Sequence, residues 1–145
     1  MVYRERVYCY ELYHQMRNIW VQDGGAILHA EYDKIGSQFL ANKNVKGVKP
    51  DFLIHTPGEI DKNFIAMEVK VVTARSDEIK CDLEKLSNLR YDANYRVTIF
   101  LIFGKNAKQK AEDTLILRGQ WGIDLNTEIW AHENANEEAT RCDEV

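Results

Sequence analysis

Residues 64–72 read FIAMEVKVV, and this stretch decides the fold that we expect for the chain. Apolar residues fill it apart from Glu68 and Lys70, a pattern typical of a strand at the centre of a sheet. Because alternate side chains of a strand share a face, Glu68 and Lys70 point to the same side. A buried charge is costly unless it is paired or binds an ion, so this strand must meet compensating groups.

The strand expected before it is DFLIHT, residues 51–56, and the segment PGEIDKN between the two has the composition of a turn. If the two strands pair as an antiparallel hairpin centred near Ile60, Asp51 lies opposite position 69, within about one residue of register. Asp51 is therefore expected beside Glu68 and Lys70.

Two adjacent carboxylates repel each other, and a half-buried pair stays ionised only beside positive charge. Lys70 supplies one such charge. A hard divalent ion would supply the rest, since Mg²⁺ usually takes one or two carboxylates together with waters and phosphate oxygens. The alternative is a structural ion-pair network of Asp51, Glu68 and Lys70.

The rest of the chain alternates between helical and strand patterns. We expect helices over residues 2–21, 76–89 and 106–118, and further strands over 26–33, 95–104 and 127–132. The order is α-β-β-β-α-β-α-β, a mixed α/β fold with a central sheet flanked by helices. We expect a single domain over residues 1–132 and an acidic, flexible tail over residues 133–145.

Composition excludes several classes of protein. The net charge of the 145 residues is -4, and residues 101–145 hold 9 acidic against 5 basic residues, so the first 100 are balanced and a nucleic-acid partner stays open. Three widely spaced cysteines give neither a disulfide framework nor a zinc site, which favours reduced thiols in the cytoplasm. No apolar stretch approaches the roughly 20 residues of a membrane span, so we expect no membrane partner.

The motif Pro50-Asp51, followed after a hairpin by Glu68-Val69-Lys70, resembles that of the PD-(D/E)XK nuclease superfamily. The common core of that family, the restriction-endonuclease-like fold, is αβββαβ, with the Asp at the start of the second strand and the ExK pair in the third. The expected element order agrees with this core over about residues 5–104. The last helix and strand are then an addition.

The resemblance implies a metal-dependent nuclease that hydrolyses phosphodiester bonds in nucleic acid, with DNA as the expected substrate. It implies that Asp51, Glu68 and the main-chain carbonyl of Val69 bind Mg²⁺ or Mn²⁺, and that Lys70 orients or deprotonates the attacking water. A nuclease of this size would gain binding surface as a homodimer.

Two further acids are candidates by the same resemblance. Members of the family often carry an acid on the first helix that faces the metal, and we assign Glu11 to this catalytic and metal-binding role, with a solvated glutamate as the alternative. Asp82, on the helix after the ExK strand, either orients Lys70 or makes a structural hydrogen bond. The alternative function for the whole chain is a non-catalytic module that binds nucleic acid or protein and retains the nuclease fold.

Overall fold

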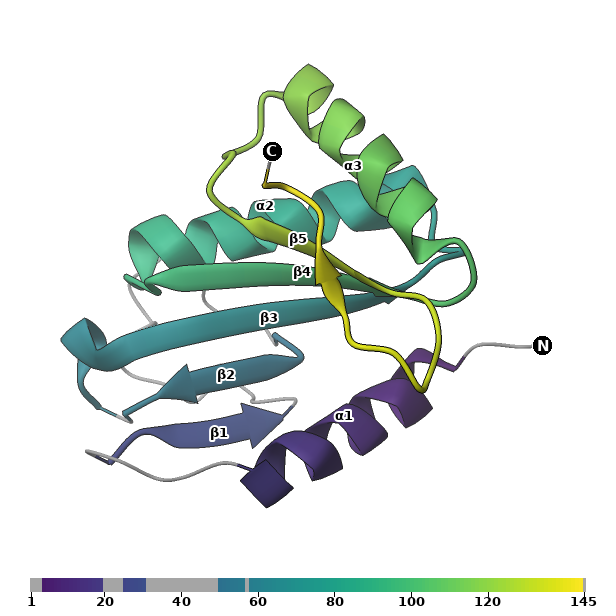
Figure 1. The fold of residues 1–145 in the computed structure, drawn as a ribbon. Helices are drawn as coiled ribbons and strands as arrows, with labels where there is room; N and C mark the ends of the chain where they lie inside the picture. Colours follow the sequence, from purple (N-terminus) through teal and green to yellow (C-terminus); the bar gives the residue numbers. More distant parts are fainter. Residues whose placement is uncertain (1–3, 20–24, 31–49, 57, 145) are drawn as a thin grey trace.

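The computed structural model describes residues 4–19, 25–30, 50–56 and 58–144 (Figure 1). Its elements, in chain order, are α1 (Glu5–Ile19), β1 (Ile27–Ala30), β2 (Phe52–His55), a short 3-10 helix η2 (Ile60–Lys62), β3 (Asn63–Val71), α2 (Ser76–Asp92), β4 (Val97–Phe103), α3 (Ala107–Trp121), β5 (Glu128–His132) and β6 (Thr140–Arg141). The predicted order of helices and strands is confirmed as far as β5. The outer parts of the expected first helix and first strand lie outside the described residues.

One mixed sheet contains all of these strands, in the order β1-β2-β3-β4-β5-β6. The first three strands form an antiparallel meander, whereas β3, β4 and β5 run parallel and β6 returns antiparallel to β5. The parallel pairs are joined by α2 and α3, because neighbouring parallel strands need a long crossover connection. The chain is therefore a mixed α/β domain.

The β2–β3 hairpin has the register that places the motif. Phe52 pairs with Met67, Leu53 with Ala66 and Ile54 with Ile65, and an irregularity follows at His55. This pairing lies within one residue of the predicted one. It brings the start of β2 beside Glu68.

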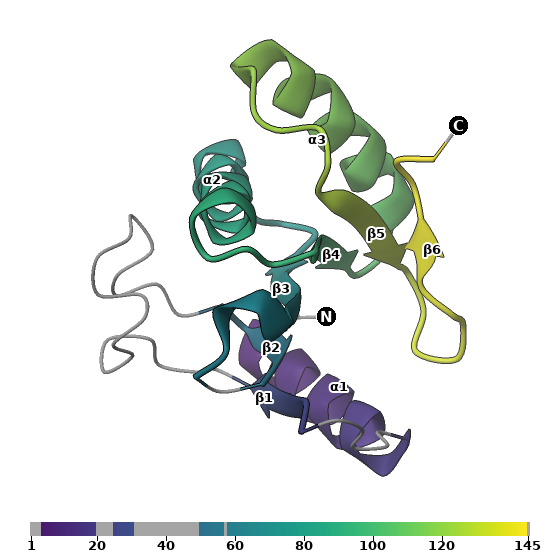
Figure 2. The same ribbon diagram turned by 90° about the vertical axis from the view of Figure 1, so that its left-hand side faces the viewer.

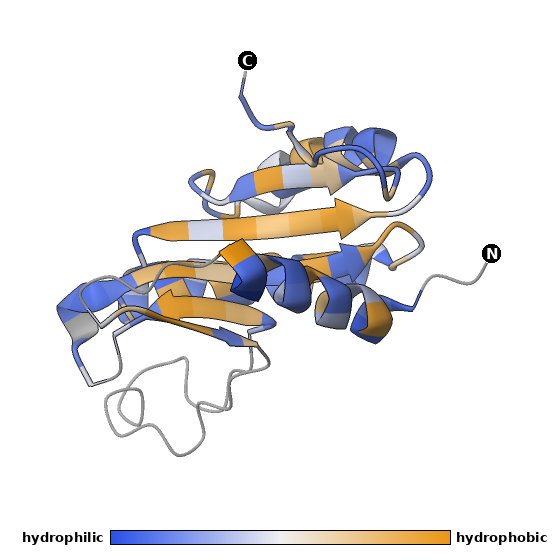
Figure 3. Ribbon diagram, turned by 60° about the horizontal axis from the view of Figure 1, so that its bottom comes forward, coloured by the Kyte–Doolittle hydropathy of each residue, from blue (hydrophilic) through white to orange (hydrophobic). Residues whose placement is uncertain are grey.

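Helices cover both faces of the sheet, with α1 on one side and α2 and α3 on the other (Figure 2). Strand β4 is apolar along almost its whole length, as Figure 3 shows. Phe100 and Ile102 belong to the core under α2 and α3, whereas Leu101 and Phe103 belong to the core under α1. No helix among the described residues is long and apolar enough to cross a membrane.

The C-terminal segment differs from the flexible tail that the sequence predicted. Thr140 and Arg141 form β6 against β5, and the Cys142 amide donates a hydrogen bond of 2.7 Å to the Ile129 carbonyl. Two acids of the segment have partners: Asp143 accepts hydrogen bonds from the Ile129 amide and from Arg141, and Glu144 Oε1 lies 2.8 Å from a guanidinium nitrogen of Arg141. Local ion pairing thus stabilises β6 as an edge strand, in a segment whose acidic composition predicted a flexible tail.

We expect Phe100→Ala to lower the free energy of unfolding by about 3–5 kcal/mol, because the side chain is fully buried in the central strand. Ile116→Ala, at an exposed position of α3, is the control and should change stability by less than about 0.5 kcal/mol. Urea denaturation followed by circular dichroism measures both. Equal effects would contradict the two-sided burial of β4.

Candidate functional site

Strand β3 continues past the start of β2, and two carboxylates satisfy its free edge (Figure 1). Asp51 Oδ2 accepts a hydrogen bond of 2.7 Å from the Val69 amide. Glu5 Oε2, from the first turn of α1, lies 3.4 Å from the Val71 amide, which donates to it. Side chains from α1, the start of β2 and β3 therefore converge on one end of β3.

Two lysines and two buried acids, Glu68 and Asp82, complete what we call the acidic cluster, made of Glu5, Asp51, Glu68, Lys70, Asp82 and Lys85. Lys70 Nζ lies 3.3 Å from Asp82 Oδ2 and 3.6 Å from Glu5 Oε1. Lys85 Nζ lies 3.1 Å from Asp82 Oδ1 and 3.3 Å from Glu68 Oε1. Asp82, on α2, thus bridges both lysines, a geometry that fits either the orienting or the structural role expected for it.

The carboxyl groups of Asp51 and Glu68 lie close enough to affect each other's protonation. Burial raises the pKa of Glu68 well above its ordinary value, and repulsion from Asp51 and Asp82 raises it further. Burial also raises the pKa of Asp51, although the Val69 amide opposes this shift. Of the two carboxyl groups, Glu68 is therefore the one that stays protonated to higher pH.

The cluster contains four carboxyl groups but only two ammonium groups. Glu68 and Asp82 are 3% and 4% exposed, so water screens them little. An excess of buried acid can be relieved by protonation or by a cation, and oxygen-rich donor sets suit hard divalent ions. The donor set of Asp51 and Glu68 therefore fits Mg²⁺ or Mn²⁺.

The main-chain carbonyl of Val69 is directed to the same place. In a strand, the N–H and C=O of one residue point toward the same neighbour. Because the Val69 N–H faces Asp51, its carbonyl faces that side as well. Val69 therefore presents its carbonyl to the side of β3 on which Asp51 lies.

Lys70 is held in its charged form. Burial alone lowers the pKa of its ammonium, but attraction to Asp82 and Glu5 outweighs burial, so the pKa is raised above the ordinary value. A lysine with a raised pKa donates hydrogen bonds and stabilises negative charge, whereas it is a poor base. Of the two roles expected for Lys70, the geometry supports orientation of water over deprotonation.

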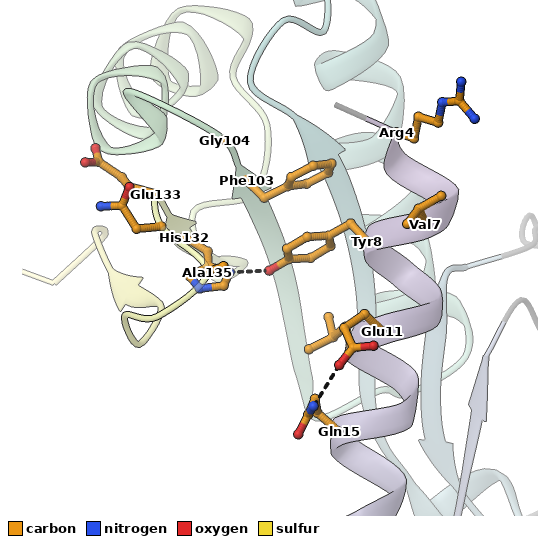
Figure 4. A pocket seen from close by; sticks show the side chains of 12 residues that line it. Arg4, Val7, Tyr8, Glu11, Gln15, Phe103, Gly104, His132, Glu133 and Ala135 are labelled. Atoms are coloured by element: carbon orange, nitrogen blue, oxygen red, sulfur yellow. Dashed lines mark hydrogen bonds between the residues drawn. The ribbon is translucent and has the colours of Figure 1, made fainter. Parts of the chain in front are cut away.

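The assignment of Glu11 is wrong. Its carboxylate is exposed and accepts a 2.7 Å hydrogen bond from Gln15, one turn along α1, and it lines a cavity beside Tyr8 and His132 (Figure 4). Glu5 contacts the cluster instead. Six residues of helix rotate the side chain by about 240°, so Glu5 and Glu11 leave α1 on different sides.

Comparison with protein-family models, with curated proteins and with solved structures finds no match to this chain. Membership of the nuclease superfamily therefore stays a prediction that rests on the residues and their geometry. Over the part of the chain that the structure describes, no three His, Cys, Asp or Glu side chains are grouped to hold a metal ion by themselves. A metal here would need the carbonyl of Val69 and water beside the two carboxylates.

The protonation of Glu68 makes stability depend on pH. In the unfolded chain Glu68 loses its proton near the ordinary pKa of 4.5, whereas in the folded chain it keeps the proton to higher pH. The free energy of unfolding must therefore fall as the pH rises from about 4.5 through the raised pKa of the folded state. We expect Glu68→Gln, which has no proton to release, to lose less stability than the wild type between pH 4.5 and 8 in EDTA. Urea unfolding across this range gives the comparison.

The exposed variant Glu59→Gln is the control for this experiment, because it removes a carboxylate that pairs only with Lys62 at the surface. Its pH profile should parallel that of the wild type. A Glu68→Gln profile that also runs parallel to the wild type would contradict the raised pKa.

Proposed function

We propose that the chain is a metal-dependent nuclease of the PD-(D/E)XK type that hydrolyses phosphodiester bonds in nucleic acid, with DNA as the first substrate to test. The observation that carries the proposal is the pair of carboxyl groups of half-buried Asp51 and buried Glu68, held beside the Lys70 ammonium at the end of β3. The element order α1-β1-β2-β3-α2-β4 supports it, since it matches the αβββαβ core of the restriction-endonuclease-like fold.

Asp51, Glu68 and the carbonyl of Val69 would hold Mg²⁺ or Mn²⁺, which when bound supplies polarisation of the scissile phosphate and a water of lowered pKa. Glu68 must release its proton on binding, because a ligating carboxylate is ionised. Asp51 is already held in place by the Val69 amide.

Lys70 supplies positive charge where negative charge develops in the reaction. Its ammonium is held between Asp82 and Glu5, so it needs little rearrangement to donate to a water or a phosphate oxygen. Asp82 and Glu5 are positioning residues for Lys70 in this scheme. Lys85 keeps part of the charge of Glu68 balanced.

A non-catalytic binding module that retains the fold is the competing proposal. Such a module would gain nothing from Asp51 and Glu68 buried against each other, because that pair destabilises the folded chain at neutral pH. A nucleic-acid substrate and a homodimer that extends the binding surface remain part of the proposal.

We expect Mn²⁺ to bind the wild type, and Asp51→Asn or Glu68→Gln to remove this binding while leaving the fold intact or more stable, since each variant relieves carboxylate repulsion. Isothermal titration calorimetry measures the affinity, and thermal unfolding measures the stability. Glu59→Gln should bind Mn²⁺ as the wild type does. Unchanged affinity in both cluster variants would place any metal elsewhere.

We expect Lys70→Ala to lower the rate of cleavage on the order of 10² to 10⁴-fold, because it removes the ammonium that stabilises the reacting phosphate. Lys70→Arg should restore only part of the rate, since a planar guanidinium cannot replace a compact donor. The assay uses linear, circular, single-stranded and branched DNA, and RNA, with Mg²⁺, Mn²⁺ or EDTA.

The matched control is Lys62→Ala, which removes a lysine from an exposed ion pair with Glu59. It should cut at the wild-type rate. Circular dichroism and Mn²⁺ titration show whether Lys70→Ala is folded and binds metal. If it is folded, binds metal and cuts at the wild-type rate, Lys70 only neutralises its neighbours and the catalytic role is wrong.

A further inference from the structure

A cavity of about 750 Å³ lies between α1 and the ends of β4 and β5 (Figure 4). Its α1 wall includes Val7, Tyr8 and Glu11, and its opposite wall includes Phe103, His132 and Glu133. None of these residues belongs to the acidic cluster. The cavity is large enough for an aromatic ligand of nucleoside size.

One side of the cavity is a fixed aromatic wall. The Tyr8 ring stacks on Phe103 with centroids 4.0 Å apart and an interplanar angle of 8°. The Tyr8 hydroxyl lies 2.7 Å from His132 Nδ1, and His132 Nε2 lies 2.8 Å from the carbonyl of Glu137. Since Nε2 donates to this carbonyl, Nδ1 accepts from Tyr8, and burial raises the pKa of Tyr8 to about 12, which keeps the hydroxyl protonated. A rigid aromatic wall of this kind suits a flat ring.

The acidic groups of the cavity favour a ligand that donates hydrogen bonds. The carboxylates of Glu11 and Glu133 line it together with Arg4, Gln15 and Asn134. Each carboxylate has a second oxygen or lone pair that can accept a hydrogen bond from an amino group. The ligand that fits is a flat ring with an amino substituent.

The cavity lies next to the acidic cluster. Phe103 pairs with Val71 across β4 and β3, and Val71 donates its amide hydrogen to Glu5. Along α1, Tyr8 is three residues from Glu5, which is about 4.5 Å of helix axis. This offset along α1 is similar to the roughly 3.4 Å rise between neighbouring nucleotides of one strand.

We propose that the cavity receives a nucleobase that carries an exocyclic amino group, from the same strand whose phosphate lies at the acidic cluster. The inference rests on the proposed nuclease function for its substrate class, and it adds a base-reading site to it. The Tyr8 ring, backed by Phe103, stacks on the base with its other face, and Glu11 or Glu133 accepts from the amino group of the base.

Free nucleosides test the proposal, because they carry no phosphate and their binding needs neither metal nor Lys70. Cytidine and uridine differ at position 4, where the amino group of cytidine is a carbonyl oxygen in uridine, and at N3, which accepts a hydrogen bond in cytidine and donates one in uridine. We expect cytidine to bind about tenfold more tightly than uridine, the effect of one hydrogen bond to a charged acceptor. Two-dimensional ¹H–¹⁵N NMR should place the shifts at Gly104 and Ala135, which line the cavity.

Two variants of α1 make the test specific. Val7→Trp fills the cavity from an exposed position and should abolish cytidine binding, whereas Tyr10→Trp, equally exposed on α1 but outside the cavity lining, should leave it unchanged. Glu11→Gln should reduce the preference for cytidine. Equal binding of cytidine and uridine, or cytidine shifts that survive Val7→Trp, would overturn the proposal.

N-acetyl-arginine amide is the competing probe, and tighter binding of this probe than of cytidine would assign the cavity to a basic protein side chain instead. The experiments distinguish failure of the nuclease proposal from failure of the base-site proposal. Cleavage by a protein that binds no cytidine would overturn the base site alone. Cytidine binding without any cleavage would overturn the nuclease function, and the cavity would remain a nucleoside site.

Discussion

The rest of the site depends on one constraint: more acid than base is buried at the end of β3. The carboxyl groups of Asp51 and Glu68 lie together there, and Asp82 pairs with the two lysines, which offset only part of the charge. A purely structural network would carry matched charges, because an unmatched buried carboxyl costs stability. The excess of carboxyl groups over ammonium groups therefore supports the proposal that a cation completes the site.

Helix α1 links this cluster to the neighbouring cavity. Its first turn brings Glu5 to the free edge of β3, and its next turn brings Tyr8 onto Phe103. Because both turns belong to one rigid helix, the position of Glu5 and the wall of the cavity are set together. A strand bound at the cluster would therefore meet a preformed aromatic surface rather than a surface that has to assemble.

The hairpin and the face shared by Glu68 and Lys70 were predictable, because strand periodicity and turn composition act over a few residues. The same local rules predicted the element order as far as β5. They could not predict that Glu5 rather than Glu11 meets β3, since this depends on how α1 lies against the sheet. The role of Lys85 was missed for a similar reason. Its position on the predicted helix is equally compatible with a solvated lysine, and only the structure shows that it lies beside Glu68. Strand β6 depends on the partners of Asp143, which composition does not report.

Carboxyl ¹³C NMR of Glu68, titrated in EDTA and then in Mg²⁺, is the most direct measurement of the acid excess and its relief. In EDTA we expect a pKa well above the ordinary 4.5, because the buried group is protonated against Asp51. In Mg²⁺ we expect that pKa to fall, since a ligating carboxylate must be ionised. An ordinary pKa in EDTA, or a raised pKa that Mg²⁺ leaves unchanged, would contradict a metal-completed site at the end of β3.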